Sequence, residues 1–173
     1  GFAGRVRPWE QADNDYRLAP RAELDQQSAK DAIEGFAVFV NRFPDSPKVP
    51  EAQEYLNILQ NRLVEKSYLS ARLYYNMKQY KAAITALTNS LKEYSESKYR
   101  EEMMYLRLHS LYLYAEKSIP ARQRERFQET LDDYFSFMEE YPESKYSKEV
   151  QKIYDSTARY LNINPADNLE NNE

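Results

Sequence analysis

One short phrase occurs three times along the chain and constrains the fold more than any other feature. Each copy places proline or serine directly after an aromatic residue, and a further serine two positions later. Proline lacks a backbone N–H and disfavours helix in the residue before it, so the phrase predicts a corner between two helices. Ser46, Ser97 and Ser144 are predicted to cap the next helix by accepting a backbone bond. The copies are FVNRFPDSPKVPEA at 39–52, LKEYSESKYREEM at 91–103 and FMEEYPESKYSKEV at 137–150.

The aromatic residues Phe43, Tyr94 and Tyr141 align the copies, and the same apolar pattern precedes each of them. Counting back from the aromatic residue, apolar side chains stand at the third, seventh and tenth positions. This spacing places them along one face of a helix, which must be buried against a neighbour. The predicted interface residues are Ile33, Phe36, Val40, Ile84, Leu87, Leu91, Leu131, Tyr134 and Met138.

Composition favours helix throughout the chain. It contains only three glycines, and neither Asn-Gly nor Asp-Gly, the strongest hairpin signals, occurs. We therefore predict an all-α protein with an irregular lead-in at 1–27, a remnant of an earlier repeat on one interpretation, a helical domain at 28–160, and a disordered acidic tail at 161–173. The predicted helices are 28–43, 48–65 (running into or ending just before 66–77), 81–94, 97–117, 120–141 and 145–160.

The segment 66–94 resembles the tetratricopeptide repeat, in which small residues let two antiparallel helices approach closely. Ser67 and Ser70 depart from it, because they stand where that repeat prefers tryptophan and leucine. The resemblance implies a superhelical array of antiparallel helix pairs, with about three repeats in 28–160. The residues at the small and aromatic spacings are Ala71, Tyr74, Tyr80, Ala83 and Leu87.

Several kinds of chemistry lack the residues they need. The chain has no cysteine, and His109 is its only histidine, so neither a nucleophile–base pair nor a usual zinc site can be built. No glycine-rich loop is present to hold a phosphate. The net charge is −4, from 24 basic and 28 acidic residues, without the basic excess that nucleic-acid binding requires. We expect no catalytic residue, metal or cofactor, and a non-enzymatic protein.

Two groups of residues are candidates for binding a protein partner. Arg122, Arg124 and Arg126 lie in the basic run KSIPARQRERF at 117–127, which suits an acidic partner or anionic head groups, or is simply a solvated loop. Arginine and aromatic anchors often dominate interface energy, which adds Arg72 and one residue of the pair Tyr74 and Tyr75. The alternatives are a solvent-facing arginine and tyrosines that fill the core.

Four longer stretches carry a second resemblance. They are APRAELDQ at 19–26, AIEGFAVFVNRFPDSP at 32–47, LYYNMKQYKAAITALTNSLKEYSESKYREE at 73–102 and RFQETLDDYFSFMEEYPESKYSKEVQKIY at 126–154. These stretches resemble the BamD family of bacterial outer-membrane lipoproteins, most closely its Bacteroidetes-type branch. That family consists of tetratricopeptide-like proteins of the machine that inserts β-barrel proteins. The resemblance implies a scaffold at the periplasmic face of the outer membrane, lipid-anchored in the full-length protein.

The resemblance covers only the later three repeats of that family. Its members begin with a lipidated cysteine and two further repeats associated with unfolded barrel substrates, and neither is recognised within residues 1–173. The later repeats dock the periplasmic domains of the barrel-forming subunit and accessory lipoproteins, so the resemblance implies docking rather than substrate capture. The alternative is another periplasmic or cytoplasmic repeat adaptor, of a cell-division or peptide-binding type.

Overall fold

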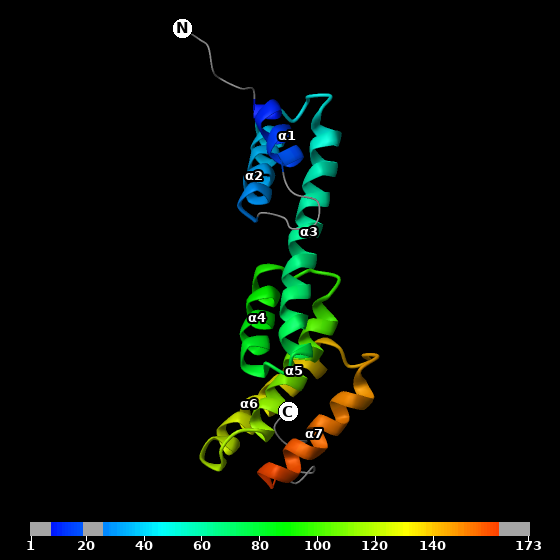
Figure 1. The fold of residues 1–173 in the computed structure, drawn as a ribbon. Helices are drawn as coiled ribbons and strands as arrows, with labels where there is room; N and C mark the ends of the chain where they lie inside the picture. Colours follow the sequence, from blue (N-terminus) through cyan, green and yellow to red (C-terminus); the bar gives the residue numbers. More distant parts are fainter. Residues whose placement is uncertain (1–7, 19–25, 163–173) are drawn as a thin grey trace. The chain divides into compact units, whose positions relative to one another are not determined.

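The computed structural model describes residues 8–18 and 26–162, and all regular structure within these ranges is helical. The chain divides into two compact units, residues 1–66 and 67–173, and the boundary falls inside one long helix, α3. Figure 1 labels the helices in chain order. Their bounds are α1 Pro8–Leu18, α2 Gln26–Arg42, α3 Val49–Asn76, α4 Tyr80–Glu93, α5 Arg100–Glu116, α6 Pro120–Glu140 and α7 Ser147–Leu161.

The all-α class predicted from the sequence is confirmed, and α2 and α4 to α7 begin and end within one turn of their predicted bounds. One expectation that was left open is decided, and one needs correction. The helix at 48–65 runs into 66–77, the first of the two predicted alternatives, because no proline or glycine interrupts α3 after its first turn. The lead-in at 1–27, expected to be irregular, contains the helix α1. The rest of that segment, 1–7 and 19–25, and the acidic tail from 163 onward lie outside the described residues.

The first unit is built around aromatic rings. Trp9 of α1 lies with its ring centroid 5.6 Å from that of Phe36 and 5.3 Å from that of Phe39, both on α2. Gly35 permits the close approach of these helices, because a Cβ atom placed there would lie 3.0 Å from the Cβ of Ala12. Helices α1 and α2 are therefore packed so closely at Ala12 and Gly35 that a larger side chain has no space there.

All three predicted corners have the same backbone hydrogen bonds. In the last corner the N–H of Ser144 donates to the carbonyl of Tyr141 at 3.3 Å, and the N–H of Ser147 donates to the carbonyl of Ser144 at 3.1 Å. The corners that begin at Phe43 and Tyr94 repeat both bonds at the same relative positions. Two successive tight turns therefore reverse the chain in each copy of the repeated phrase.

Each corner serine accepts a hydrogen bond from the residue just before the next helix, not from the first helical turn as predicted. The Oγ of Ser144 accepts from the N–H of Tyr146 at 3.0 Å, and Tyr146 itself is the residue that precedes α7. Ser97 accepts in the same way from Tyr99, and Ser46 accepts from Lys48. Each serine thus stabilises the turn before the helix rather than an N–H of the first helical turn.

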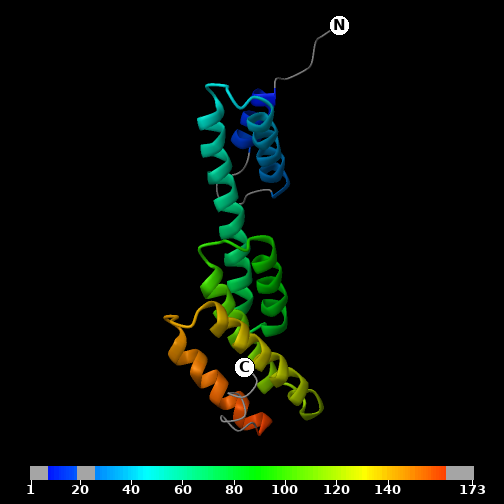
Figure 2. The same ribbon diagram turned by 180° about the vertical axis from the view of Figure 1, so that it is seen from behind.

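In the second unit, α4 lies antiparallel to the last part of α3, as Figures 1 and 2 show. Ala71 and Ala83 are fully buried between them, as expected for residues that let two helices approach closely. The Oγ atoms of Ser67 and Ser90 are 2.9 Å apart and join the same helices. The serine that departs from the tetratricopeptide pattern therefore has a partner within this helix pair.

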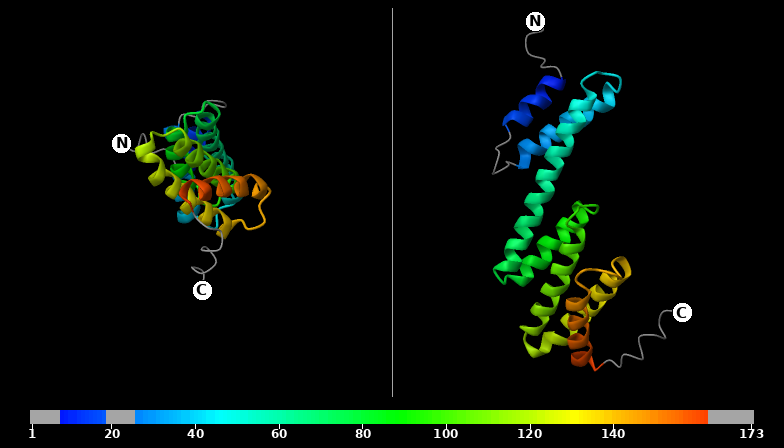
Figure 3. Two further views of the ribbon diagram at one scale, coloured as in Figure 1. Left: turned by 90° about the horizontal axis from the view of Figure 1, so that it is seen from below. Right: turned by 90° about the vertical axis from the view of Figure 1, so that its right-hand side faces the viewer.

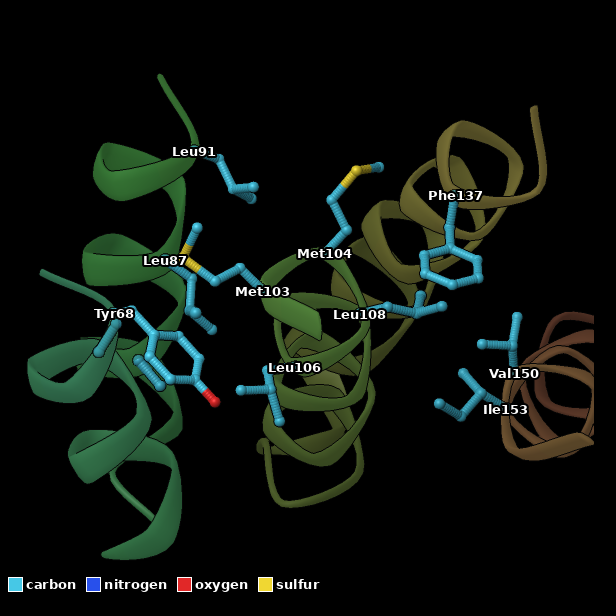
Figure 4. Close-up of a cluster of buried hydrophobic side chains, with 12 residues drawn as sticks. Tyr68, Leu87, Leu91, Met103, Met104, Leu106, Leu108, Phe137, Val150 and Ile153 are labelled. Atoms are coloured by element: carbon cyan, nitrogen blue, oxygen red, sulfur yellow. The ribbon is translucent and has the colours of Figure 1, made fainter. Parts of the chain in front are cut away.

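Helix α5 is packed on both sides by other helices of the second unit. Consecutive helices of this unit pack in the manner of tetratricopeptide-like repeats. Figure 4 shows Met103 pointing toward Leu87 on α4, whereas Leu108 points toward Phe137 on α6. Figure 3 shows α7 following α6 on the far side of α5 from α4. Because both sides are covered, buried residues occur on several faces of α5 rather than along one stripe.

Most of the predicted stripe residues face the interior. Leu87, Leu91, Leu131 and Phe36 are buried, and the other five are half-buried. On α2 the buried face is centred on Ala32, Phe36 and Phe39 rather than on Ile33 and Val40. The aromatic residue at the first corner, Phe43, is 45% exposed, unlike its half-buried counterparts in the later corners.

Candidate partner-binding surfaces

A row of apolar side chains on α3 faces away from the core of the second unit. Leu69, Leu73 and Met77 are 49%, 57% and 58% exposed and follow one another at intervals of one helical turn. Tyr74, which is 41% exposed, lies at the edge of the row nearest α4, where it also lines a surface hollow. Four exposed large apolar side chains within nine residues form a patch rather than the scattered exposure that is normal for a soluble domain.

The hollow lies beside this row and has a volume of about 590 Å³. It is formed where two alanines of α4, Ala82 and Ala86, leave the helix surface low between longer neighbours. Its rim carries a hydroxyl from Thr85, amides and the ammonium of Lys81. The lining residues are Tyr74, Gln79, Lys81, Ala82, Thr85, Ala86 and Asn89. We call the apolar row and this hollow together the α3–α4 surface.

The charges beside the α3–α4 surface are mostly basic, although the exposed Glu65 and Glu93 lie one helical turn beyond Leu69 and Asn89. Between residues 67 and 92 the charged side chains are Arg72, Lys78, Lys81 and Lys92, with no aspartate or glutamate, in a chain whose net charge is −4. All four are exposed. The surface is therefore apolar with a basic surround, a combination that attracts acidic groups.

Arg72 lies on the opposite side of the apolar row from Tyr74. Its Nη1 donates to the hydroxyl of Tyr68 at 3.2 Å, and that hydroxyl donates to the carboxylate of Glu102 on α5. The hydrogen bond to Tyr68 is the main cause that raises the pKa of Arg72, and the charge of Glu102 adds to it. Arg72 is thus exposed but held in place by a chain of polar contacts.

The neighbours Tyr74 and Tyr75 point in different directions, as their positions on a helix require. Tyr75 is half-buried, and its hydroxyl lies 2.7 Å from Nδ1 of His109 on α5. Burial is the main cause that raises the pKa of Tyr75. Of the two candidates, Tyr74 is the exposed residue on the α3–α4 surface, and Tyr75 joins α3 to α5.

His109, the only histidine of the chain, also lies against the ring of Tyr105, with 5.9 Å between ring centroids. Burial lowers the pKa of His109, although the charges of Glu149 and Glu116 act in the opposite direction. Among residues 8–18 and 26–162, no group of three or more histidine, aspartate or glutamate side chains could hold a metal ion. The contacts of His109 are those of a residue that packs helices together.

The other candidate region is the basic corner formed by Lys117, Arg122, Arg124 and Arg126. Arg122 is 3.3 Å from the carboxylate of Glu125. Arg126 donates to Ser118 at 2.6 Å and stacks over the ring of Tyr114 at 4.2 Å. Arg124 is exposed and makes no ion pair within the described part of the chain. Two of the three predicted arginines therefore already have partners within the corner.

The apolar row on α3 and the one-sided charge of 67–92 were not identified from the sequence. The charge run could have been found by counting, because no acidic residue occurs between Glu65 and Glu93. The row could not, since Leu69, Leu73 and Met77 repeat with the same period as buried residues of the helix. Only the position of α4 and α5 decides which face of α3 is covered.

Within the described ranges, no helix combines the length and the apolar character needed to cross a bilayer. No curated protein matches the chain. The model of the YfiO family, described as an outer membrane lipoprotein, matches residues 6–104 and again residues 73–161. Two overlapping matches are expected of a chain in which one helical unit is repeated. The resemblance found in the sequence is thereby confirmed, and the chain belongs to the YfiO, or BamD-like, family of outer membrane lipoproteins.

Proposed function

We propose that this chain is a non-enzymatic scaffold of the machinery that assembles β-barrel proteins in the outer membrane. The observation that carries the proposal is the family match, which extends from residue 6 to residue 161. The packed helix pairs and an exposed apolar surface with a basic surround support it, because such surfaces hold other proteins rather than transform small molecules.

In this role the chain docks the periplasmic domains of the barrel-forming subunit and accessory lipoproteins. A lipid anchor holds the full-length protein at the periplasmic side of the outer membrane. Arg72 and Tyr74 on the α3–α4 surface, and Arg122, Arg124 and Arg126 in the basic corner, are the proposed contact residues. Tyr75 contributes by holding α3 against α5.

The test is a binding measurement between the purified chain and the periplasmic domains of the barrel subunit from the same organism. Isothermal titration calorimetry is expected to show a saturable complex with one chain per subunit. The double variant Arg122→Glu and Arg124→Glu then shows whether the basic corner contributes, since both side chains are exposed and their reversal leaves the core intact. If neither the barrel subunit nor any accessory lipoprotein of the complex binds the folded chain, the proposal is wrong.

A further inference from the structure

The geometry points to the α3–α4 surface as the docking site for an acidic amphipathic helix of a partner protein. The helix lays its apolar side chains on Leu69, Leu73 and Met77 and inserts one of them into the hollow over Ala82 and Ala86. Acidic residues on its flanks meet the basic surround. This inference names the chemistry of what the scaffold holds and so rests on the proposed function.

The apolar row has the form that an opposing helix requires. Leu69, Leu73 and Met77 lie at intervals of four residues, and helices pack by fitting such rows into the grooves of a neighbour. Partners of this type present apolar residues at similar intervals of three, four and seven positions. An extended strand, whose side chains alternate between two faces, would match the row poorly.

The hollow adds a place for a single large side chain. Ala82 and Ala86 form its floor, and their backbone lies close to the surface because the side chains are small. Its volume is about 590 Å³, and it is wide and open to solvent rather than an enclosed pocket. Polar groups of Gln79, Thr85 and Asn89 line it and can bond to groups at the edge of the partner helix.

The mostly basic charge of the surface favours a partner with acidic groups. Arg72, Lys78, Lys81 and Lys92 are exposed, and they outnumber the exposed Glu65 and Glu93 at the two ends of the surface. Rim charges of one sign speed the approach of an oppositely charged partner and repel a similar one. The partner helix therefore carries aspartate or glutamate beside its apolar face.

Two other occupants of such a patch, a second copy of the chain and an anionic bilayer, fit the surface less well. A second copy of the chain would bring two basic surfaces together, which repel each other. An anionic bilayer would contact the projecting row of Leu69, Leu73 and Met77 but would leave the recess over Ala82 and Ala86, with its polar lining, unfilled. A recess with polar groups around it fits the side chain of a protein partner.

The inference can be tested with synthetic peptides of about 18 residues, long enough to form helix in isolation. The acidic probe carries leucine and phenylalanine on one face and glutamate beside them, and the basic probe has lysine in place of every glutamate. Binding to the whole chain is measured by fluorescence anisotropy. We expect the acidic probe to bind at least about tenfold more tightly than the basic one, with an affinity that falls as salt is added.

Variants of the chain locate the site. Three variants are each expected to weaken binding of the acidic probe about tenfold or more. Leu73→Glu removes apolar contact, Lys81→Glu reverses a rim charge, and Ala82→Trp fills the hollow. The matched control is Lys148→Glu, an equal change of charge at an exposed position of α7, which is expected to leave the affinity unchanged. Circular dichroism identifies the variants that keep the native helix content, and only these are compared.

Four results would overturn the inference. They are equal binding of both probes, equal loss with Lys148→Glu, equal binding of an acidic probe made extended by prolines, and self-association or binding to anionic vesicles that Leu73→Glu abolishes. Failure of the scaffold role is a separate result, because it requires that the barrel subunit and accessory lipoproteins do not bind. A chain that binds the subunit but not the acidic probe keeps the scaffold role and loses this inference.

Discussion

Tyr75 and His109 join α3 to α5 through one hydrogen bond, with 2.7 Å between the tyrosine oxygen and Nδ1 of the imidazole. Both residues are half-buried, and Tyr105 covers the other side of the imidazole. The bond crosses between two helices that belong to successive helix pairs. Contacts of this kind fix how one pair is placed on the next, which is the property that a scaffold needs.

Replacing Tyr75 with phenylalanine is expected to lower the free energy of unfolding by about 1–2 kcal/mol, because the half-buried His109 loses its hydrogen-bond partner on α3. The measurement is urea unfolding followed by circular dichroism. Tyr74→Phe is the matched control and is expected to change stability by less than about 0.5 kcal/mol, since Tyr74 is exposed. Equal effects of the two variants would contradict the importance of the interhelical bond.

The lowered pKa of His109 predicts a loss of stability in acid. In the unfolded chain the imidazole gains a proton near pH 6.5, whereas in the folded chain it stays neutral to lower pH, so the unfolded state binds more protons in between. The contribution of neutral His109 to stability is fully present above about pH 6.5. It is lost as the pH falls toward the lowered pKa of the folded chain. Urea unfolding at several pH values should show that the free energy of unfolding depends less on pH in His109→Gln than in the original chain. An unchanged slope would contradict the prediction.

Lys78→Gly is expected to stabilise the protein. Lys78 ends α3 with φ of 59°, and its neighbour Gln79 donates a backbone bond to Tyr74 that completes the helix end. Glycine adopts this conformation without the steric cost that a side chain brings, so we expect a gain of about 0.5–1 kcal/mol. Thermal unfolding measures it, and Lys78→Ala, which keeps the Cβ atom, should show no gain.

The three corner serines are expected to differ in importance. Ser144 accepts from Tyr146 and donates to Glu101 of α5 at 2.6 Å, whereas Ser46 accepts only a single exposed bond, from Lys48. Ser144→Ala should therefore cost about 1–2 kcal/mol and Ser46→Ala about 0.5 kcal/mol, as urea unfolding would show. The reverse order would mean that the tertiary bond to Glu101 contributes nothing.

Ala83→Leu is expected to cost about 1–3 kcal/mol, because Ala83 is fully buried between α3 and α4 and a larger side chain overpacks their interface. Ala82→Leu, one residue earlier and in the floor of the hollow, should leave thermal stability nearly unchanged. Similar losses for both would show that the hollow is part of the packed core.

The helix corners could be predicted because their causes are local. Proline or serine after an aromatic residue, followed by serine, determines each turn within a few residues, and the structure repeats the same backbone bonds three times. The continuity of α3 was one of two predicted alternatives, and the lack of a helix breaker after Pro50 explains why it holds. Helix α1 was missed because its segment carries no copy of the repeated phrase.

The candidate surface could be predicted only in part. Arg72 and Tyr74 were identified from residue type, but Tyr75, equally suitable by type, lies against His109. In the basic corner, Arg126 was expected to be available, yet it stacks on Tyr114. A sequence states which residues share a helix face, whereas the neighbouring helices decide which face stays open to solvent.

The equal length of the three corners has a consequence for insertions. Each runs from an aromatic residue to the start of the next helix in the same number of steps, as between Tyr141 and Ser147. One extra residue there would break the two paired backbone bonds of the corner and move the start of the following helix, so that Val150 and Ile153 would no longer lie in register with the core. Loops elsewhere can lengthen freely, but at these corners natural variants should gain or lose whole helical hairpins rather than single amino acids.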